Sequence, residues 1–551
     1  MSNRQGMSPG FIGRGGCLES PRAFLSGLIS ETLMRMKTSK LSHLVTSGLL
    51  MAFGFLSSPT VAQTVISGPN IMTSTWSPAG SPYIIAANCT VPNGQTLTIL
   101  PGTTVWMGSG VSLTGIGAIQ AIGTPAQRIV FEPPILSQMW NTIIVNNTVS
   151  TNQFRYCTFL NGTNALDFGN GVATGIARHN EIISCSFSNT VRAITLRDSG
   201  TNRVVECVFA NSSNAILLSV LGNNAPVIGP QQTTIINSTF TNIASQTITG
   251  QAIGRVGFFW QNDAKLTALI QNCVFGSIGA GCAFSMSGQS ANYSGSIVTG
   301  YGQIGARILN NTFANVQAGA ISFSAGSYSQ SAPTAVINNV VANAGGGLST
   351  QDPWDISVQN NIFKSCSSAV TRSGALSTTV GYNDFIFNST NFVGYPVTYG
   401  QAILANRNGT PCDVLFNIYS DPLFVSPSDF HLQAGSPCID AGEGSGSNFD
   451  SYFPPSMGSV TNDIGAYGGP NAGQWIVPSP TNAFSLAISK STMASVTINP
   501  PEPGNYRLEY ASALLGTNTW IQITNLPLTT VPFTYTEPIT TPARYYRAVK
   551  Q

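Results

Sequence analysis

The tetrapeptide "NNTF" (310–313) decides the fold, because it recurs as "NNVV" (338–341) and "NNIF" (360–363). Its second position is Cys, Ser or Asn, and its fourth is Phe in eight of nine copies. The other six copies are "YCTF" (156–159), "SCSF" (184–187), "ECVF" (206–209), "NSTF" (237–240), "NCVF" (272–275) and "YNDF" (382–385).

The spacing of the copies identifies the type of repeat. The shortest spacing is 22 residues, as from 184 to 206, and longer spacings vary. A β-solenoid has this property, because each coil has three short strands and the excess length goes into loops. Apolar residues alternate with period two, which indicates strands and not helices. We therefore predict about ten coils stacked ~4.8 Å apart, with the Phe residues in one internal column and the Asn residues hydrogen-bonded from coil to coil.

A second strand follows most copies of the tetrapeptide, as in "ALDF" (165–168), "AITL" (193–196) and "AISF" (320–323). Alternation predicts that Leu166 and Phe168 point inward and that Asp167 points outward. On the next coil Thr195 and Arg197 are predicted to point outward.

Composition excludes several classes of function. Of the 551 residues 8% are charged, 42% are hydrophobic and the formal net charge is +2. The sequence has no basic stripe with interleaved aromatic residues, so we expect no nucleic-acid partner. The three histidines, His43, His179 and His431, lie far apart, so we expect no metal site. No phosphate-binding glycine motif is found, and no cofactor is expected.

The N-terminus has the pattern of an export signal. Lys37 and Lys40 precede an apolar run at 44–56, and small residues follow up to Ala62. We predict an unstructured extension at 1–33 and a signal peptide at 34–62. The apolar run is shorter than the roughly 20 residues that span a membrane. The mature protein is therefore predicted to be secreted or located at the cell surface, with no transmembrane segment after signal cleavage.

Two further segments carry a family resemblance. They are "VPNGQTLTILPGTTVWMGSGVSLTGIGAIQAIGTPAQRIVF" (91–131) and "SDPLFVSPSDFHLQAGSPCIDAG" (420–442), the latter followed by "NDIGAYGG" (462–469). With the repeats, they resemble bacterial secreted right-handed parallel β-helix proteins of the pectin-lyase-like fold. The resemblance implies an all-β solenoid over 65–470. It implies less about function, because this fold hosts lyases, hydrolases, adhesins and non-catalytic surface proteins.

The last part of the chain differs in composition. A linker is predicted at 471–481. Residues 482–551 contain the strand patterns "YRLEYAS" (506–512), "TWIQI" (519–523) and "ARYYRAV" (543–549). They resemble a fibronectin type III-like β-sandwich.

The resemblance also tells where enzymatic residues would lie. Lyases of this fold use clustered carboxylates to bind calcium and an Arg or Lys as base, and hydrolases use two or three Asp residues on adjacent coils. The outward positions of the second strand hold one carboxylate, Asp167, and one cation, Arg197. With Asp198 they could form a small charged cluster, which as an ordinary surface ion pair would have no catalytic role. A turn at 351–355 offers Asp352 and Asp355 beside Trp354.

Two function classes therefore stay open. The favoured one is a non-catalytic protein that binds extracellular polysaccharide or mediates surface interactions. The alternative is a polysaccharide lyase or glycoside hydrolase that acts on an extended glycan in a groove along the β-helix.

The three longest coils are consecutive, and their excess length is predicted to form loops at about 219–233, 249–268 and 287–306. Such loops would build a wall beside the solenoid, and aromatic and polar residues there could bind a sugar. Alternatively, the aromatic side chains pack the loops against themselves. The candidate ligand-binding residues are Trp260, Asp263, Lys265, Tyr293 and Tyr301.

Ten cysteines in an exported protein raise the question of disulfides. The slot that Asn fills in later coils is occupied in earlier ones by Cys157, Cys185, Cys207 and Cys273, which are predicted to be buried thiols. Cys412 and Cys438 lie outside this series and are the disulfide candidates.

Overall fold

The structure is a computed structural model, and the predicted extension at 1–33 and the predicted signal peptide at 34–62 lie outside the residues that it describes. The described residues are 63–146, 151–169, 178–197, 200–221, 230–257, 260–262, 264–291, 302–325, 329–331, 333–351, 356–374, 379–474, 485–490, 493–499, 504–511, 521–528, 533–538 and 545–550.

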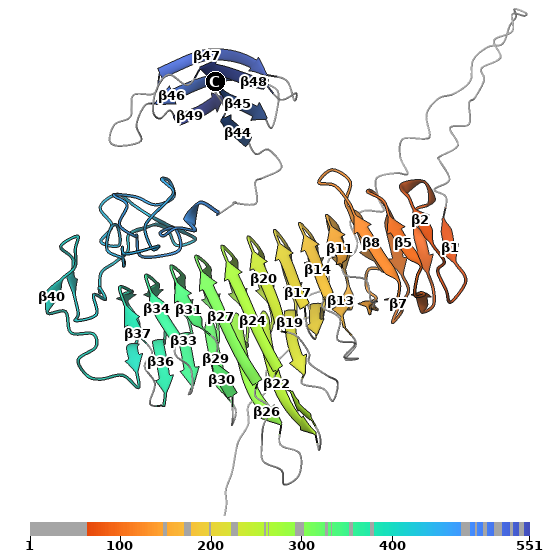
Figure 1. Cartoon of the computed structure of the whole chain (residues 1–551), viewed down its shortest axis with the longest axis horizontal. Helices are drawn as coiled ribbons and strands as arrows, with labels where there is room; N and C mark the ends of the chain where they lie inside the picture. The colour runs from red at the N-terminus through yellow and green to blue at the C-terminus, as the bar shows by residue number, and fades with distance from the viewer. Residues whose placement is uncertain are drawn as a thin grey trace, which may run out of the picture. The chain divides into compact units, whose positions relative to one another are not determined.

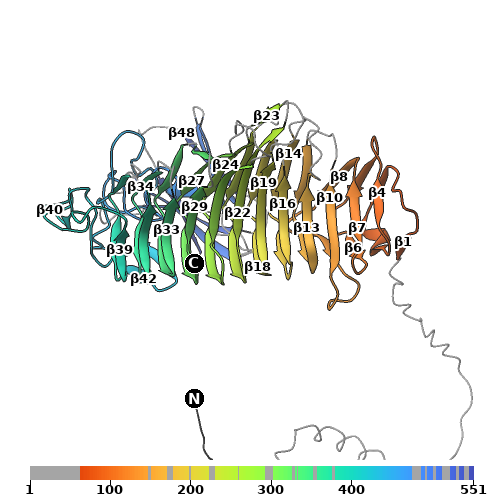
Figure 2. The same cartoon turned by 90° about the horizontal axis from the view of Figure 1, so that it is seen from below.

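Three long parallel sheets, which we call A, B and C, form a solenoid (Figure 1, Figure 2). Along the chain, successive strands join sheet C, then sheet A, then sheet B, and this order repeats in each coil. Sheet A consists of β1 (Thr64–Ile66), β3 (Tyr83–Ile85), β6 (Thr104–Met107), β9 (Ile129–Glu132), β12 (Cys157–Leu160), β15 (Ser186–Ser188), β18 (Val208–Ser212), β21 (Thr239–Ile243), β25 (Val274–Ile278), β28 (Thr312–Val316), β32 (Val340–Ala344), β35 (Ile362–Lys364) and β38 (Asp384–Ile386).

Sheets B and C each have twelve strands in their main path and one additional strand. Sheet B consists of β4 (Cys89–Val91), β7 (Ser112–Gly115), β10 (Trp140–Val145), β13 (Gly162–Phe168), β16 (Arg192–Arg197), β19 (Asn214–Leu221), β22 (Ile248–Gly257), β26 (Phe284–Ala291), β29 (Ile321–Ala325), β33 (Gly346–Gln351), β36 (Ser368–Ser373) and β39 (Thr390–Val393), with β23 (Trp260–Asn262) antiparallel to β22. Sheet C consists of β2 (Ser74–Trp76), β5 (Thr96–Ile99), β8 (Ala118–Ile122), β11 (Thr151–Arg155), β14 (Arg178–Ile183), β17 (Gly200–Val205), β20 (Gln231–Ile236), β24 (Ala264–Gln271), β27 (Gly302–Leu309), β31 (Thr334–Ile337), β34 (Ile356–Gln359) and β37 (Thr379–Gly381), with β30 (Ser329–Ser331) beside β27.

The predicted parallel β-helix is confirmed, although it has more coils than the ten or so predicted. Sheet A has 13 strands. The additional coils come from residues 64–131, where the tetrapeptide is not recognisable. A short 3₁₀ helix, η1 (Pro78–Gly80), lies between β2 and β3.

The phenylalanines of the repeat form the predicted column on the inner face of sheet A. Phe159 is in register with Phe187, and Phe187 with Phe209. The rings are buried, and those from Phe131 to Phe313 stack with centroids 4.6–5.0 Å apart. This distance is the spacing of adjacent parallel strands, so backbone pairing itself places like residues above like.

The second position of the repeat forms the predicted internal ladder. Asn311 donates to Oδ1 of Asn339, and Asn339 to Oδ1 of Asn361, each over 2.9 Å. In the earlier coils the thiols are buried as predicted, and burial raises the pKa of Cys273 to about 12. A small inward side chain is therefore common to the whole ladder, and the amides also satisfy buried backbone groups such as the carbonyl of Ile308.

Each of the nine coils from β12 to β38 turns two corners with a residue in the left-handed conformation. The first position of the repeat forms the corner from sheet C to sheet A, as at Asn338 (φ 53°). A second residue forms the corner from sheet A to sheet B, as at Asn242 (φ 53°) and Asn343 (φ 56°). Asn tolerates this conformation better than most residues, which explains its abundance here.

The predicted loops of the three longest coils are partly wrong. Much of the excess length extends the sheets: β22 has 10 residues, and β24, β26 and β27 have eight each. β22 and β26 stay paired as far as Arg255 and Ala291, and both extend beyond their neighbours in Figure 1. Extra residues added to paired parallel strands satisfy their own backbone groups, so a longer coil does not require a longer loop.

After β39 a closing segment packs on the last coils. It contains β40 (Leu404–Ala405), β41 (Pro411–Cys412), β42 (Phe424–Ser426), β43 (Asp429–Leu432) and the 3₁₀ helix η2 (Ala472–Gln474). Phe430 and Cys438 form a core with Val340 and Ile362 on the outer face of sheet A. The amide of Asn310 donates to the carbonyls of 466 and 468, so the segment also covers the corner between sheets C and A.

The predicted bridge between Cys412 and Cys438 is not formed, because both are buried free thiols in the structure. Cys438 Sγ instead donates to Oδ2 of the buried Asp384, 3.6 Å away. The Cys438 thiol, which was expected to form a disulfide, thus donates a hydrogen bond to a carboxyl group.

The C-terminal strands form two antiparallel sheets of three strands. One contains β44 (Ser485–Lys490), β45 (Met493–Asn499) and β48 (Phe533–Pro538), and the other β47 (Ile521–Leu528), β46 (Gly504–Ala511) and β49 (Tyr545–Lys550). Throughout the described part of the chain, no helix has the length and apolar character needed to cross a bilayer.

Candidate functional site

The predicted loop-wall residues are only partly described. Lys265 lies on β24 with an exposed side chain. Trp260 lies in β23, which pairs with β22, but its side chain is outside the described set. Asp263, Tyr293 and Tyr301 lie outside the described residues. Their role in binding stays a prediction.

The outer face of sheet B carries a row of hydroxyl groups, as the alternation predicts. Ser285, Ser322 and Ser349 are in register. The predicted pair of Asp167 and Arg197 is confirmed, with Oδ2 and an Nη atom 3.2 Å apart. Asp198 and the acidic turn at 352–355 lie outside the described residues. In the described part of this row Asp167 is the one carboxylate, whereas glycoside hydrolysis requires two.

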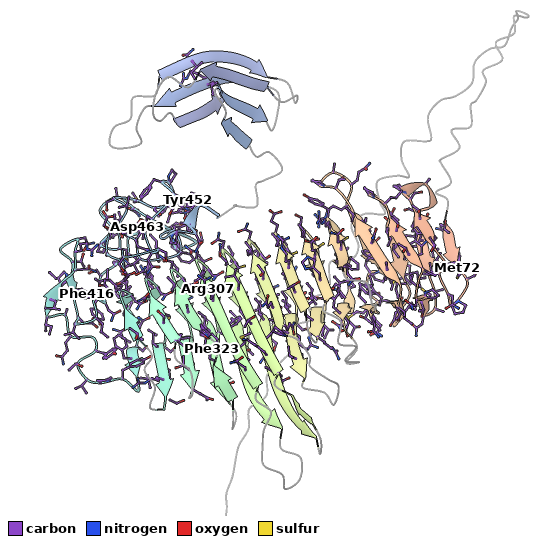
Figure 3. The ribbon with its side chains drawn as sticks, in the orientation of Figure 1. Met72, Arg307, Phe323, Phe416, Tyr452 and Asp463 are labelled. Carbon is purple, nitrogen blue, oxygen red and sulfur yellow. The ribbon has the colours of Figure 1, made fainter. Side chains whose placement is uncertain are left out.

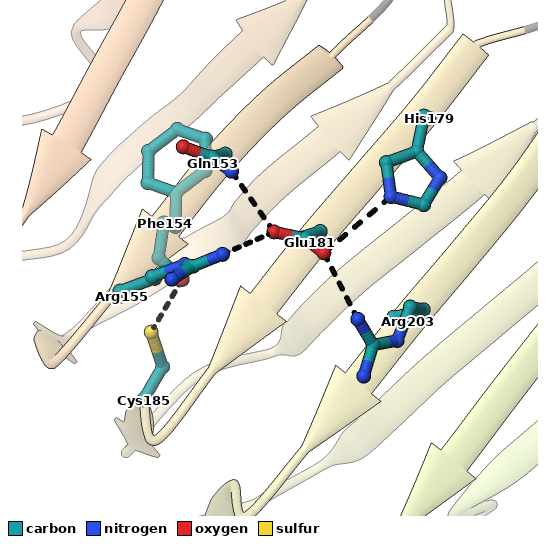
Figure 4. Close-up of polar contacts among 7 residues, drawn as sticks. All are labelled: Gln153, Phe154, Arg155, His179, Glu181, Cys185 and Arg203. Atoms are coloured by element: carbon teal, nitrogen blue, oxygen red, sulfur yellow. Dashed lines mark hydrogen bonds and ion pairs between the residues drawn. The ribbon is translucent and has the colours of Figure 1, made fainter.

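A charged cluster on the outer face of sheet C escaped sequence analysis (Figure 4). Glu181 on β14 accepts hydrogen bonds from Arg155, 2.6 Å away on β11, and Arg203, 3.0 Å away on β17. Gln153 donates to it over 2.9 Å, and His179 lies 3.4 Å from it. The hydrogen bond from Arg155 is the main reason why the pKa of Glu181 is lowered to about 2. This carboxylate therefore orients two guanidinium groups and is no candidate acid catalyst.

Next to this cluster the same face is hollowed. The hollow has a volume of about 330 Å³ and is lined by Thr234, Lys265, Thr267 and Arg307 among others. Figure 3 shows Arg307 on sheet C. Neither Lys265 nor Arg307 forms an ion pair with any described residue, and both are exposed.

A second hollow is a groove along the corner from sheet A to sheet B, which we call the corner groove. Its first part has a volume of about 640 Å³ and follows five coils. The left-handed corner residues line it, and Asn343 donates to Oδ1 of Asn315 over 2.6 Å. These corner residues are Asn242, Ser277, Asn315, Asn343 and Ser365.

The second part of the corner groove runs under the β42–β43 hairpin. It has a volume of about 590 Å³ and shares Asn315, Asn343 and Ser365 with the first part, so the groove is continuous. Lys364 lies at this end, paired with Asp421 over 2.7 Å. Its ammonium group is also 5.3 Å from the centre of the Phe424 ring. This end thus combines an apolar ring with a charged pair.

Small side chains explain why the groove exists. In the outward row of sheet A, Gly276, Ala314 and Ala342 are in register and precede the corner residues, until Lys364 ends the series. After the corner, Gly345 contacts the preceding coil so closely that a Cβ atom would lie 2.2 Å from the backbone oxygens of Gln317 and Ala318. Part of the signal was present in the sequence, because Asn or Ser follows most phenylalanines of the repeat by two residues. Ala or Gly stands two residues later at 244, 279 and 345.

Among the described residues no group of three or more His, Cys, Asp and Glu side chains is placed to hold a metal ion. In a search of known proteins, no family model matched the chain and no curated protein matched its sequence.

Proposed function

We propose that this protein is an extracellular polysaccharide-binding protein and that an extended glycan lies in the corner groove. The observation that carries the proposal is the continuity of the groove: two hollows of about 640 and 590 Å³ share three corner residues and run along the stacked coils. A repeating polymer suits a repeating site, because each coil offers a similar set of amide and hydroxyl groups.

The chemistry of the groove favours a sugar polymer over an apolar or peptide ligand. Amides such as Asn343 can bind sugar hydroxyls, and the ring of Phe424 offers an apolar face for stacking. The closing hairpin then limits the groove at Lys364 and Asp421.

Binding is favoured over catalysis by the distribution of carboxylates. Asp421 is the one carboxylate among the described residues that line the groove, and Lys364 neutralises it. The alternative, a polysaccharide lyase or glycoside hydrolase, would require a carboxylate pair or a calcium-binding cluster that these residues do not provide.

The sequence supports the proposed location. The predicted signal peptide at 34–62 and the resemblance to bacterial secreted β-helix proteins favour a secreted or cell-surface protein. We propose that the two C-terminal antiparallel sheets pack as a fibronectin type III-like sandwich, which would serve as a spacer or a second binding module.

Affinity electrophoresis of the purified protein against a panel of neutral and acidic polysaccharides tests the proposal. We expect the double variant Asn343→Gly with Phe424→Ala to bind the retained polymer at least tenfold more weakly, because glycine keeps the left-handed corner while the amide and the ring are lost. Val65→Ala, an exposed change on β1 at the other end of the solenoid, should leave binding unchanged.

A second pair of changes separates this groove from the predicted loop wall. If Trp260→Ala with Tyr293→Ala abolishes binding while the groove variant binds normally and has an unchanged unfolding temperature, the glycan lies at the wall and the groove proposal is wrong.

A further inference from the structure

We infer that the outer face of sheet C is a second, separate binding site, which takes a polyanionic glycan with sulfate or carboxylate groups along its length. The inference does not depend on the corner groove. That groove lies at the corner between sheets A and B and is lined by uncharged residues along most of its length.

Uncompensated positive charge is the first argument. The described part of this face carries Arg155, Arg203, Lys265 and Arg307 against one carboxylate, Glu181. Glu181 pairs with the two arginines nearest to it, so the charges of Lys265 and Arg307 have no protein counter-ion among the described residues. The next carboxylate, Glu206, lies at the turn after β17 and accepts a hydrogen bond from Ser184.

The register of the strands sets the distances between the cations. Arg203 pairs with Thr234, Thr234 with Leu269 and Leu269 with Arg307, so the two arginines lie three strands, or roughly 14 Å, apart. Lys265 lies four residues before Leu269 on β24, roughly 13 Å along the strand. One phosphate or sulfate ion cannot contact all three groups, whereas a polymer with several anionic groups can.

The hollow between the cations combines hydroxyl groups with apolar residues such as Leu269 and Pro333. Thr234 and Thr267 line it beside Lys265 and Arg307, and no Phe, Tyr or Trp is among its described lining residues. Single-stranded nucleic acids are typically held by stacking of bases on aromatic rings, and this face lacks such rings. The Glu181 cluster also holds the guanidinium of Arg203 in place at the edge of the hollow, which reduces the entropy lost on binding.

Titration calorimetry of the purified protein with dextran sulfate, polygalacturonate, uncharged dextran and DNA tests the inference. We expect one or both of the anionic glycans to bind and dextran not to bind at this face. Lys265→Gln with Arg307→Gln should weaken this binding at least tenfold and reduce the slope of log affinity against log salt by about two, by analogy with phosphate contacts in DNA complexes. Arg407→Gln, an exposed cation in the closing segment, is the matched control for Arg307→Gln and should have no effect.

The two glycans distinguish the source of the charge. Binding of dextran sulfate alone identifies a sulfated ligand, and binding of polygalacturonate alone a carboxylated one. Unchanged affinity in the folded double variant, or tighter binding of DNA than of either glycan at equal salt, would overturn the inference. The corner-groove variant serves as a cross-check, because it should keep its affinity for the polyanion at this face.

Discussion

At the scale of single residues, one position of each coil dominates the core. The ring of Phe240 is fully buried and stacks on Phe209 and Phe275, each 4.7 Å away. Such stacked rings contribute both buried apolar area and specific ring contacts. The neighbour Thr241 points outward on the same strand and is only partly buried.

We predict that Phe240→Ala lowers the free energy of unfolding by about 3–5 kcal/mol, because the cavity remains between two stacked rings. Phe240→Leu should cost less, and Thr241→Ala should stay within about 0.5 kcal/mol of the wild type. Urea unfolding followed by circular dichroism measures all three. Equal losses of unfolding free energy for Phe240→Ala and Thr241→Ala would contradict the conclusion that the phenylalanine column stabilises the core.

At the scale of the elements, the corners define where strands end. In the nine coils from β12 to β38, the bend from sheet A toward sheet B contains one left-handed residue, such as Asn242 (φ 53°), whose amide donates to Oδ1 of Asn211 over 2.6 Å. The corner groove is a consequence, because the chain changes direction there without a bulky loop. Strand length is set differently, by how far two neighbouring coils continue to pair.

We predict that Asn242→Ala destabilises the protein by about 1–2 kcal/mol, whereas Asn242→Gly is nearly neutral. This order is the reverse of that expected inside an ordinary strand, where glycine is the worse residue. Thermal unfolding of the two variants gives the comparison. Alanine tolerated as well as glycine would show that the corner does not require the left-handed conformation.

At the scale of the whole molecule, charge is distributed unevenly along the chain. Residues 384–474 contain eight acidic residues and one basic residue. Four of the carboxyl groups are buried, and burial raises the pKa of three of them, to about 8 for Asp384 and Asp450 and to about 7 for Asp463. The attachment of the closing segment to the solenoid is therefore the part of the molecule that responds to pH near neutrality.

The sign of this response follows from the raised pKa values. The folded protein keeps a proton on Asp384 up to about pH 8, whereas the unfolded chain releases it near pH 4. The free energy of unfolding is therefore highest below about pH 4 and falls between pH 4 and pH 8, by an amount on the order of a few kcal/mol. Protonation of Glu181 affects the free energy of unfolding only at lower pH, because the pKa of this group is lowered to about 2.

We predict that the unfolding temperature falls from pH 5 to pH 9 and that Asp384→Asn makes this fall less steep, because the amide does not ionise. The amide oxygen can still accept the hydrogen bond from the Ser420 backbone, which is 3.1 Å long in the wild type. Differential scanning calorimetry at four pH values measures both curves. Parallel curves for the wild type and the variant would contradict the assignment of the effect to Asp384.

The sequence by itself determined the coil. The period of 22 residues, the inward Phe and the Asn that replaces Cys are local signals, and parallel stacking turns each of them into a column without further choice. Fewer coils were predicted than are found, because the first coils keep the shape of the repeat without its tetrapeptide. The corner groove could have been predicted too, since its Asn, Ser and Gly residues recur with the repeat.

Only the tertiary structure decided the charged face and the state of the thiols. Arg203, Lys265 and Arg307 lie in coils of different length, so their approach depends on the register of β17, β20, β24 and β27. Cys438 meets Asp384 because the closing segment folds back onto sheet A. Contacts of this kind join residues far apart in the sequence, and the periodicity of the sequence does not predict which of them will lie close together.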